Sequence, residues 1–109
     1  MTKKTLYISD LDGTLLNSQS QVSATSRDML NRLIADNGIN FSIATARTPA
    51  TVVQLMDGID SRLPYIVMTG AAMWQDGLVN QTYMRPEEVE CLSELSRKYG
   101  IRPFFYTYN

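Results

Sequence analysis

The chain has 109 residues, of which 44% are hydrophobic, and its 10 basic and 11 acidic residues leave a formal net charge of −1. This length suffices for one small domain, and the balanced charge excludes the basic surface typical of proteins that bind nucleic acid or anionic membranes. The single cysteine, Cys91, excludes an internal disulfide and is predicted to be a small packed residue. No apolar run reaches membrane-spanning length and no signal-peptide core is present, which predicts a soluble cytoplasmic protein. Because the chain has no histidine, acid–base chemistry near neutral pH falls to carboxylates, Lys, Tyr or Cys.

The first predicted element is a buried strand, residues 6–8, which ends in the carboxylates of Asp10 and Asp12. Side chains two residues apart on an extended backbone point to the same face, so both carboxylates are expected on one side. Gly13 then allows a sharp turn, and Thr14 adds a hydroxyl beside it. In open parallel sheets, ligands bind at the carboxyl ends of strands, and this stretch therefore predicts a binding site.

Two other interpretations of this stretch are a surface turn and a calcium loop. Asp-Gly is a common turn pair, but a turn does not explain why an apolar strand meets two acids before the chain becomes apolar again at Leu15 and Leu16. A calcium loop needs Gly at its sixth position and Glu at its twelfth. With Gly13 in the sixth position, Ile8 is the first residue and Gln19 the twelfth, which excludes a calcium loop.

The next two elements predict a βαβ unit. Ser23 is a candidate N-cap for a helix that runs to about Asn37, and Gly38 lies where a C-terminal glycine belongs. The apolar segment Ile39–Ala44 then predicts a central strand. A strand, a helix and a strand within about 40 residues predict a parallel sheet and the α/β class.

Polar residues also follow the second predicted strand. Thr45, Ala46 and Arg47 come directly after it, and Thr48 can cap a new helix that has Pro49 in its first turn. Thr45 would then lie just before a helix N-terminus, where a phosphate is favoured. Arg47 can contact a phosphate or substrate, or pair with a carboxylate to orient the loop. Taken alone, each is more simply explained without function, Thr45 as an ordinary strand-end residue and Arg47 as a solvated cation.

The middle of the chain predicts one more strand and a hairpin. A helix of about ten residues is expected before Gly58, followed by a third buried strand at Tyr65–Met68. That strand leads into Thr69 and Gly70, where the glycine marks either a loop close to the site or an ordinary turn. An Asp-Gly pair within residues 73–79 predicts a β-hairpin.

The last part of the chain predicts a helix and a further strand. Pro86 begins an acidic helix start, and Gly100 ends the helix. One apolar face of this helix consists of Val89, Leu92, Leu95 and Tyr99. The aromatic segment Ile101–Tyr108 is predicted to be β-rich, with its aromatics packed in a core.

The sequence Asp-x-Asp-Gly-Thr-Leu after an N-terminal strand resembles the first motif of the haloacid dehalogenase-like phosphatases. The resemblance implies that Asp10 is the nucleophile of an aspartyl-phosphate intermediate, while Asp12 is the general acid and base. It further implies Mg²⁺, bound by the Asp10 side chain and the Asp12 backbone carbonyl, and a phosphate-positioning role for Thr14. Carboxylates suit covalent catalysis and proton transfer, and a hard cation suits oxygen ligands.

The later motifs are similar to the Cof-type branch of that family. In the second motif, a Thr or Ser binds the transferred phosphoryl group, and Thr45 occupies that place. The branch commonly has Thr-Gly-Arg here, so Ala46 replaces a glycine while Thr45 and Arg47 are kept as phosphate or substrate contacts. Where the branch has Asn-Gly-Ala after the third strand, this chain has Thr69 before Gly70, and Gly70 is expected near the substrate.

The resemblance also implies an α/β cap domain inserted after the third strand. We expect residues 1–83 to form the N-terminal part of a Rossmann-like, parallel-sheet phosphatase core, and residues 84–109 to be the incomplete start of a cap. In the family, a phosphate-binding Lys and an Asp-rich metal motif follow the cap. Lys98 is a poor candidate for that Lys, because it lies within the predicted cap helix.

Two functional hypotheses follow from the sequence. One is the N-terminal part of a Mg²⁺-dependent phosphatase for a small phosphorylated metabolite such as a sugar phosphate. The other is a stand-alone phosphate or Mg²⁺ binder, or an interaction module without catalysis. A phosphomutase agrees less well with an insertion after the third strand, and a transport ATPase would need Lys directly after Asp10. The sequence leaves the substrate and the oligomeric state open.

Overall fold

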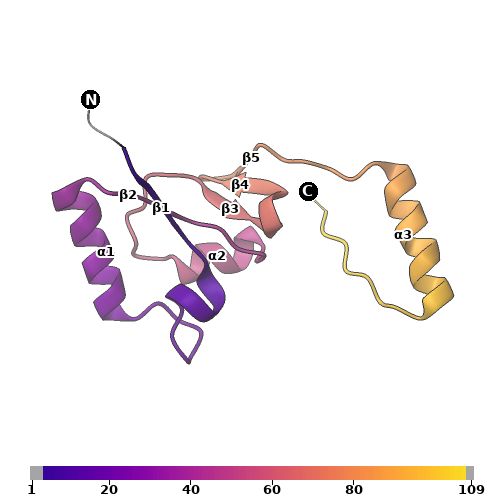
Figure 1. Cartoon of the computed structure of the whole chain (residues 1–109), viewed down its shortest axis with the longest axis horizontal. Coiled ribbons are helices and arrows are strands. Elements are labelled where there is room, and N and C mark those ends of the chain that lie inside the picture. Colours follow the sequence, from indigo (N-terminus) through magenta and orange to yellow (C-terminus); the bar gives the residue numbers. More distant parts are fainter. Residues whose placement is uncertain (1–3, 108–109) are drawn as a thin grey trace.

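The computed structural model describes residues 4–107, and its elements alternate as expected for an α/β protein (Figure 1). In chain order, they are β1 (Leu6–Ser9), α1 (Ala24–Asn37), β2 (Asn40–Ile43), α2 (Pro49–Leu55), β3 (Tyr65–Val67), β4 (Ala72–Trp74), β5 (Leu78–Val79) and α3 (Pro86–Tyr99). A π-type turn at Leu11–Leu15 follows β1, and a 3₁₀ turn at Met68–Gly70 follows β3. None of the helices within residues 4–107 is long and apolar enough to cross a membrane.

The strands form a parallel pair and an antiparallel sheet that are joined side by side. β1 and β2 are parallel, with Tyr7 opposite Phe41, and α1 connects them, which confirms the predicted βαβ unit. β3, β4 and β5 form an antiparallel sheet. A parallel bridge between Ala44 and Ile66 links β2 to β3, so the carboxyl ends of β1, β2 and β3 meet at one edge.

Local signals place the ends of the first two helices. The Ser23 side chain accepts a hydrogen bond from the Ser26 N–H at 3.1 Å, and α1 ends at Gly38, whose φ of 62° is left-handed. α2 begins after Thr48 with Pro49 in its first turn, as predicted, although the Thr48 side chain makes no capping hydrogen bond. α2 has 7 residues rather than the expected ten or so, and it ends at Leu55.

The hydrophobic core lies between α1, α2 and the strands. Fully buried side chains come from the turn after β1, from β2, from α2 and from β3: Leu11, Ile43, Val52 and Val67. β2 is buried along three of its four residues, which confirms the prediction of a central strand. The core therefore packs against β2, β3 and the turn after β1, which meet at the carboxyl edge of the sheet.

β1 differs from its prediction in two ways. It is not buried: Leu6 is 56% exposed, Tyr7 54% and Ile8 47%. β1 is also an edge strand, because β2 is its only partner strand among the described residues. The strand also ends at Ser9, so Asp10 and Asp12 follow it rather than continue it, and the argument from strand alternation does not apply to them.

The predicted hairpin is present, and the third strand is one residue shorter than expected. β4 and β5 are joined through Asp76 and Gly77, with φ values of 53° and 145°. β3 ends at Val67 because Met68 has a left-handed φ of 50°, which a strand cannot accommodate. β3 is half-buried at Tyr65 and Ile66, and fully buried only at Val67.

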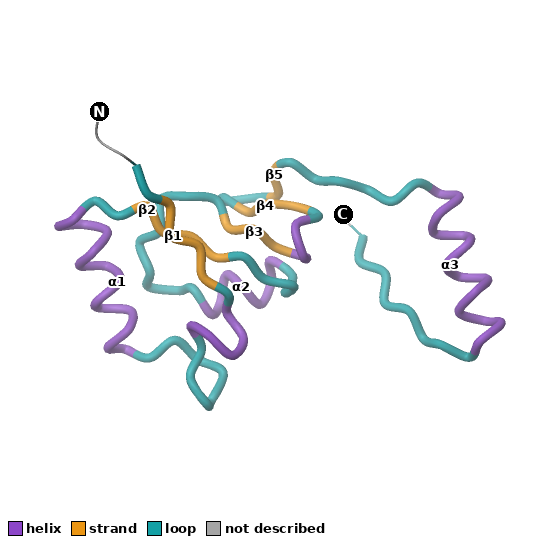
Figure 2. Tube along the Cα trace, viewed as in Figure 1, coloured by secondary structure: helices purple, strands orange, loops and turns teal. Residues whose placement is uncertain are grey.

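α3 lies apart from the strands, at one end of the long axis, and the segment that follows it runs back toward them (Figure 2). α3 runs from Pro86 to Tyr99 and ends at a left-handed Gly100, as predicted. No residue of α3 is buried, so the prediction that Cys91 is packed is wrong. No described element covers its apolar face closely enough to bury a side chain.

The prediction of a β-rich segment after α3 is also wrong. Residues 101–107 form no strand, because none of the strands within residues 4–107 pairs with them, and Tyr108 lies outside the described residues. The aromatics that were expected in a core are exposed: Phe104 is 85% exposed and Tyr106 66%. A high β propensity alone does not form a strand without a partner backbone.

Candidate active site

The loops after β2 and β3 are held together by backbone hydrogen bonds at the carboxyl edge of the strands. The Thr45 N–H donates to the Ile66 carbonyl at 3.0 Å, and the Thr69 N–H donates to the Thr45 carbonyl at 3.0 Å. The Met68 N–H donates to the Arg47 carbonyl at 2.9 Å. These bonds fix the loop after β2 against the loop after β3, so polar side chains on both have a defined separation.

Four of the predicted site residues line one cavity at this edge. Asp10, Thr45, Ala46 and Gly70 surround a space of about 370 Å³. Thr45 is only 5% exposed, and its Oγ1 accepts a hydrogen bond from the Arg47 N–H at 3.1 Å. A hydroxyl that accepts such a bond keeps its own proton to donate. Thr45 is therefore placed to donate a hydrogen bond to an anion in the cavity.

Asp10 is oriented by the turn that follows β1. Its Oδ1 accepts a hydrogen bond from the Leu11 N–H at 2.8 Å, and its carbonyl accepts one from the Ser9 hydroxyl at 2.8 Å. The Leu15 N–H also donates to this carbonyl at 3.3 Å. Gly13 adopts a φ of 77°, which lets the chain reverse directly after the two acids. The carboxylate of Asp10 is thus held in one orientation at the end of β1.

Asp12 and Arg47 form a two-pronged ion pair between the loops after β1 and β2. Arg47 Nε donates to Asp12 Oδ2 at 2.8 Å, and Arg47 Nη2 donates to Asp12 Oδ1 at 2.7 Å. The hydrogen bonds from Arg47 lower the pKa of Asp12, and those same bonds raise the pKa of Arg47. Of the two roles predicted for Arg47, the structure shows the ion pair with a carboxylate.

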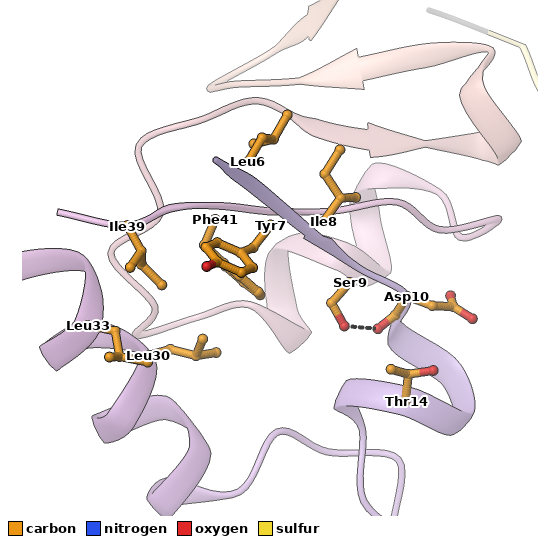
Figure 3. Close-up of a pocket in the computed structure, with 10 residues that line it drawn as sticks. All are labelled: Leu6, Tyr7, Ile8, Ser9, Asp10, Thr14, Leu30, Leu33, Ile39 and Phe41. Carbon is orange, nitrogen blue, oxygen red and sulfur yellow. Dashed lines mark hydrogen bonds between the residues drawn. The ribbon is translucent and has the colours of Figure 1, made fainter. Parts of the chain in front are cut away.

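Thr14 does not line the cavity that Asp10 shares with Thr45. With Asp10, it lines a different and larger groove of about 780 Å³ that follows β1 and α1 (Figure 3). That groove is mostly apolar, and its lining includes Leu6, Ile8, Leu30, Leu33 and Ile39. The predicted phosphate contact of Thr14 therefore stays a prediction, whereas Asp10 and Thr45 share one cavity.

The segment between β3 and β4 contains a feature that the sequence analysis did not find. Met68, Thr69 and Gly70 have φ values of 50°, 54° and 90°, so three consecutive residues are left-handed. Non-glycine residues rarely adopt this conformation, and a β-branched residue such as Thr69 does so at a cost. The sequence held one indication of this left-handed turn: the family resemblance places Asn at position 69, and Asn tolerates the left-handed conformation better than Thr.

The oxygen donors at the end of β1 are suited to Mg²⁺. This cation prefers oxygen ligands, commonly binds one or two carboxylates and keeps several waters. The Asp10 carboxylate, with Oδ1 already fixed by Leu11, and the Asp12 carbonyl are such donors. Within residues 4–107, no group of three or more His, Cys, Asp or Glu side chains is arranged to hold a metal ion. The donors fit Mg²⁺ in type, and water and phosphate oxygens would complete the shell.

Comparisons with known proteins agree with the motifs. The sequence profile of the haloacid dehalogenase-like hydrolases matches residues 7–109. Among curated proteins, the 5-amino-6-(5-phospho-D-ribitylamino)uracil phosphatase YwtE of Bacillus subtilis (strain 168) is 36% identical over 87 residues. The match covers 78% of this chain and 29% of that protein. The chain therefore spans about a third of the length of the relatives it matches.

Solved structures show the same fold. The phosphatase BT1666 from Bacteroides thetaiotaomicron matches with a TM-score of 0.74 and 28% identity, over 89% of this chain and 36% of that one. The sugar phosphatase BT4131 matches with a TM-score of 0.63 and 25% identity, over 90% of this chain and 38% of that one. The α/β architecture of this chain is thus shared with the matching third or so of these phosphatases.

Proposed function

Because the chain belongs to the haloacid dehalogenase-like hydrolases, we propose that the whole protein is a Mg²⁺-dependent phosphatase that hydrolyses a small phosphorylated metabolite. The observation that carries this proposal is the shared cavity of Asp10 and Thr45. It combines a fixed carboxylate with a buried hydroxyl whose proton is free to bind a phosphate oxygen. A sugar phosphate is the substrate class we favour, since BT4131 is a sugar phosphatase.

In the first step, a carboxylate oxygen of Asp10 attacks phosphorus, and the bond from phosphorus to the alcohol oxygen breaks. Thr45 holds the transferred phosphoryl group, and Asp12 gives a proton to the departing alcohol. Mg²⁺, held by the Asp10 carboxylate and the Asp12 carbonyl, would supply positive charge against the phosphoryl oxygens. The products of this step are the free alcohol and an acyl phosphate on Asp10.

In the second step, water attacks phosphorus, and its proton moves to Asp12 while the Asp10–phosphate bond breaks. A general base must be ionised to accept this proton. The ion pair with Arg47 lowers the pKa of Asp12, which suits the base of this step, whereas the proton that Asp12 gives in the first step has to be bound against that shift. Free phosphate and the original Asp10 carboxylate are restored.

The proposal is tested with Asp10→Asn in the protein at the length that its source makes, with Mg²⁺ and a panel of sugar phosphates. The amide cannot act as the nucleophile, so turnover should fall by at least about 1,000-fold. Asp36→Asn, at an exposed position of α1, is the matched control and should keep full activity. Turnover by Asp10→Asn at the wild-type rate would overturn the proposed mechanism. Parallel assays of residues 1–109 alone test the prediction that this stretch binds phosphate or Mg²⁺ without catalysis.

A further inference from the structure

Arg47 connects all three loops of the candidate active site. Its side chain binds Asp12 in the loop after β1, its N–H donates to Thr45 Oγ1, and its carbonyl accepts from the Met68 N–H in the turn after β3. The carbonyl therefore fixes the main chain of Arg47 to the turn after β3, while the N–H fixes it within its own loop. Its side chain is 29% exposed, so the guanidinium lies at the mouth of the site rather than in the core.

The Asp12 side chain lacks comparable support. It is 56% exposed, and the residues that line the cavity of Asp10 and Thr45 do not include it. Its backbone lies next to Gly13, whose left-handed conformation marks the tightest part of the turn. Arg47 donates a hydrogen bond to each of its two carboxylate oxygens, at 2.7 and 2.8 Å. The fork of a guanidinium fixes both the position and the plane of a carboxylate, which a single donor cannot do.

We propose that Arg47 is a positioning residue for proton transfer: it sets the place and orientation of the Asp12 carboxylate relative to the alcohol that leaves from the cavity. This inference rests on the proposed function. It assigns Arg47 to the leaving-group side of the reaction rather than to the binding of the transferred phosphoryl group, which falls to Thr45. Proton transfer requires a separation within hydrogen-bond reach, so a freely rotating Asp12 would lose efficiency.

The leaving group separates these two roles experimentally. An alkyl phosphate such as glucose 6-phosphate releases a poor leaving group that needs a proton, whereas p-nitrophenyl phosphate releases a stable anion that does not. With Arg47→Ala, we expect kcat/KM to fall by about 100-fold for the alkyl phosphate and by less than about 5-fold for the aryl phosphate. Arg47→Lys keeps the charge but loses the fork, and should show the same selective loss to a smaller degree.

A double-mutant cycle tests whether Arg47 acts through Asp12. In an Asp12→Asn background, Arg47→Ala should cause almost no further loss with the alkyl phosphate, because the group that it positions is already gone. Urea unfolding of each variant, followed by Trp74 fluorescence, shows whether the fold is kept. Arg47→Lys keeps the inference testable if Arg47→Ala does not fold.

Several outcomes would overturn the inference. Equal losses with both substrates, persisting in the Asp12→Asn background, would show that Arg47 binds the phosphoryl group. Unchanged kcat/KM in Arg47→Ala would show that the ion pair has no part in turnover. A wild-type protein that hydrolyses neither substrate nor any sugar phosphate would overturn the proposed function, and this inference with it. The first two outcomes leave the proposed function standing.

Discussion

The two 14-residue helices α1 and α3 are built alike but have different surroundings. Each begins after an extended capping residue and ends at a left-handed glycine, Gly38 or Gly100. α1 buries Ile34 against the core, whereas α3 buries no residue and exposes Leu92 and Leu95 by 42% and 45%. Local signals therefore determine that a helix forms, but not what its apolar face will contact.

The same difference extends to the two regions that contain these helices. All the buried hydrophobic residues lie between Leu11 and Ala72, while the described residues from 86 onward include none. The accessible surface is 8226 Å², about 2,000 Å² more than expected for a compact 12.3 kDa protein. The radius of gyration is 17.1 Å, against about 13 Å for a compact chain of this length. Residues 4–83 thus contain the core and the candidate site, whereas α3 lies away from both, and residues 104–107 return to line a pocket with Met68 and Ala71.

The largest expected difference between the two regions is in the effect of removing apolar side chains. Ile43→Ala, at a fully buried position of β2, should lower the free energy of unfolding by about 2–5 kcal/mol. Leu92→Ala, on the exposed face of α3, should change it by less than about 0.5 kcal/mol. Urea unfolding followed by the fluorescence of Trp74, which lies in β4, measures both. Similar losses for the two variants would show that α3 packs against the core in solution.

The sequence predicted the features that depend on neighbouring residues. Ser23, Gly38 and Gly100 mark helix ends through their own side chain or conformation, so their prediction was correct. The parallel pairing of β1 with β2 followed from the length of the connection. Burial of β1 and pairing of residues 101–107 depend on what lies beside them, and an apolar pattern carries no such information.

The candidate site was predicted to a similar extent. The motifs placed Asp10, Thr45 and Gly70 at strand ends, and the topology brought them to one cavity. The partner of Arg47 could not be decided from the sequence, because Asp12 lies 35 residues away and a phosphate was an equally good ligand. Thr14 follows Asp10 closely in sequence, yet the turn directs it to the groove beside β1. Once a strand has ended, closeness in sequence does not predict which residues line the same cavity.

A matched pair of glycine substitutions sharpens the comparison of the two helices. An added Cβ at Gly38 or Gly100 would meet no atom within 4 Å, so the cost of alanine at either position is backbone strain alone. That strain is about 1–2 kcal/mol for a left-handed alanine. Gly38→Ala should lower the stability reported by Trp74 by about 1 kcal/mol, because α1 unfolds together with the core.

Gly100→Ala should leave the unfolding curve of Trp74 unchanged and instead reduce the helical signal of α3, measured by circular dichroism below the unfolding transition. A shift of the Trp74 curve as large as that of Gly38→Ala would contradict the separation of the two regions. Gly38→Ala and Gly100→Ala introduce the same side chain at nearly the same φ, 62° and 67°, so each is the control for the other.

A small gain in stability is expected within the site itself, at Thr69. This exposed residue has a φ of 54°, a strained conformation for a β-branched residue. The strain lowers the stability of the region that contains the core, and not that of residues 84–107. Thr69→Asn should raise the free energy of unfolding by about 0.5–1 kcal/mol, because Asn adopts the left-handed conformation more readily. Thr69→Val keeps the β-branched shape, so it should give no gain, and the same urea titration measures both. If Asn and Val have the same effect, the backbone at Thr69 is relaxed in solution, and the turn between β3 and β4 stores no strain beside the cavity.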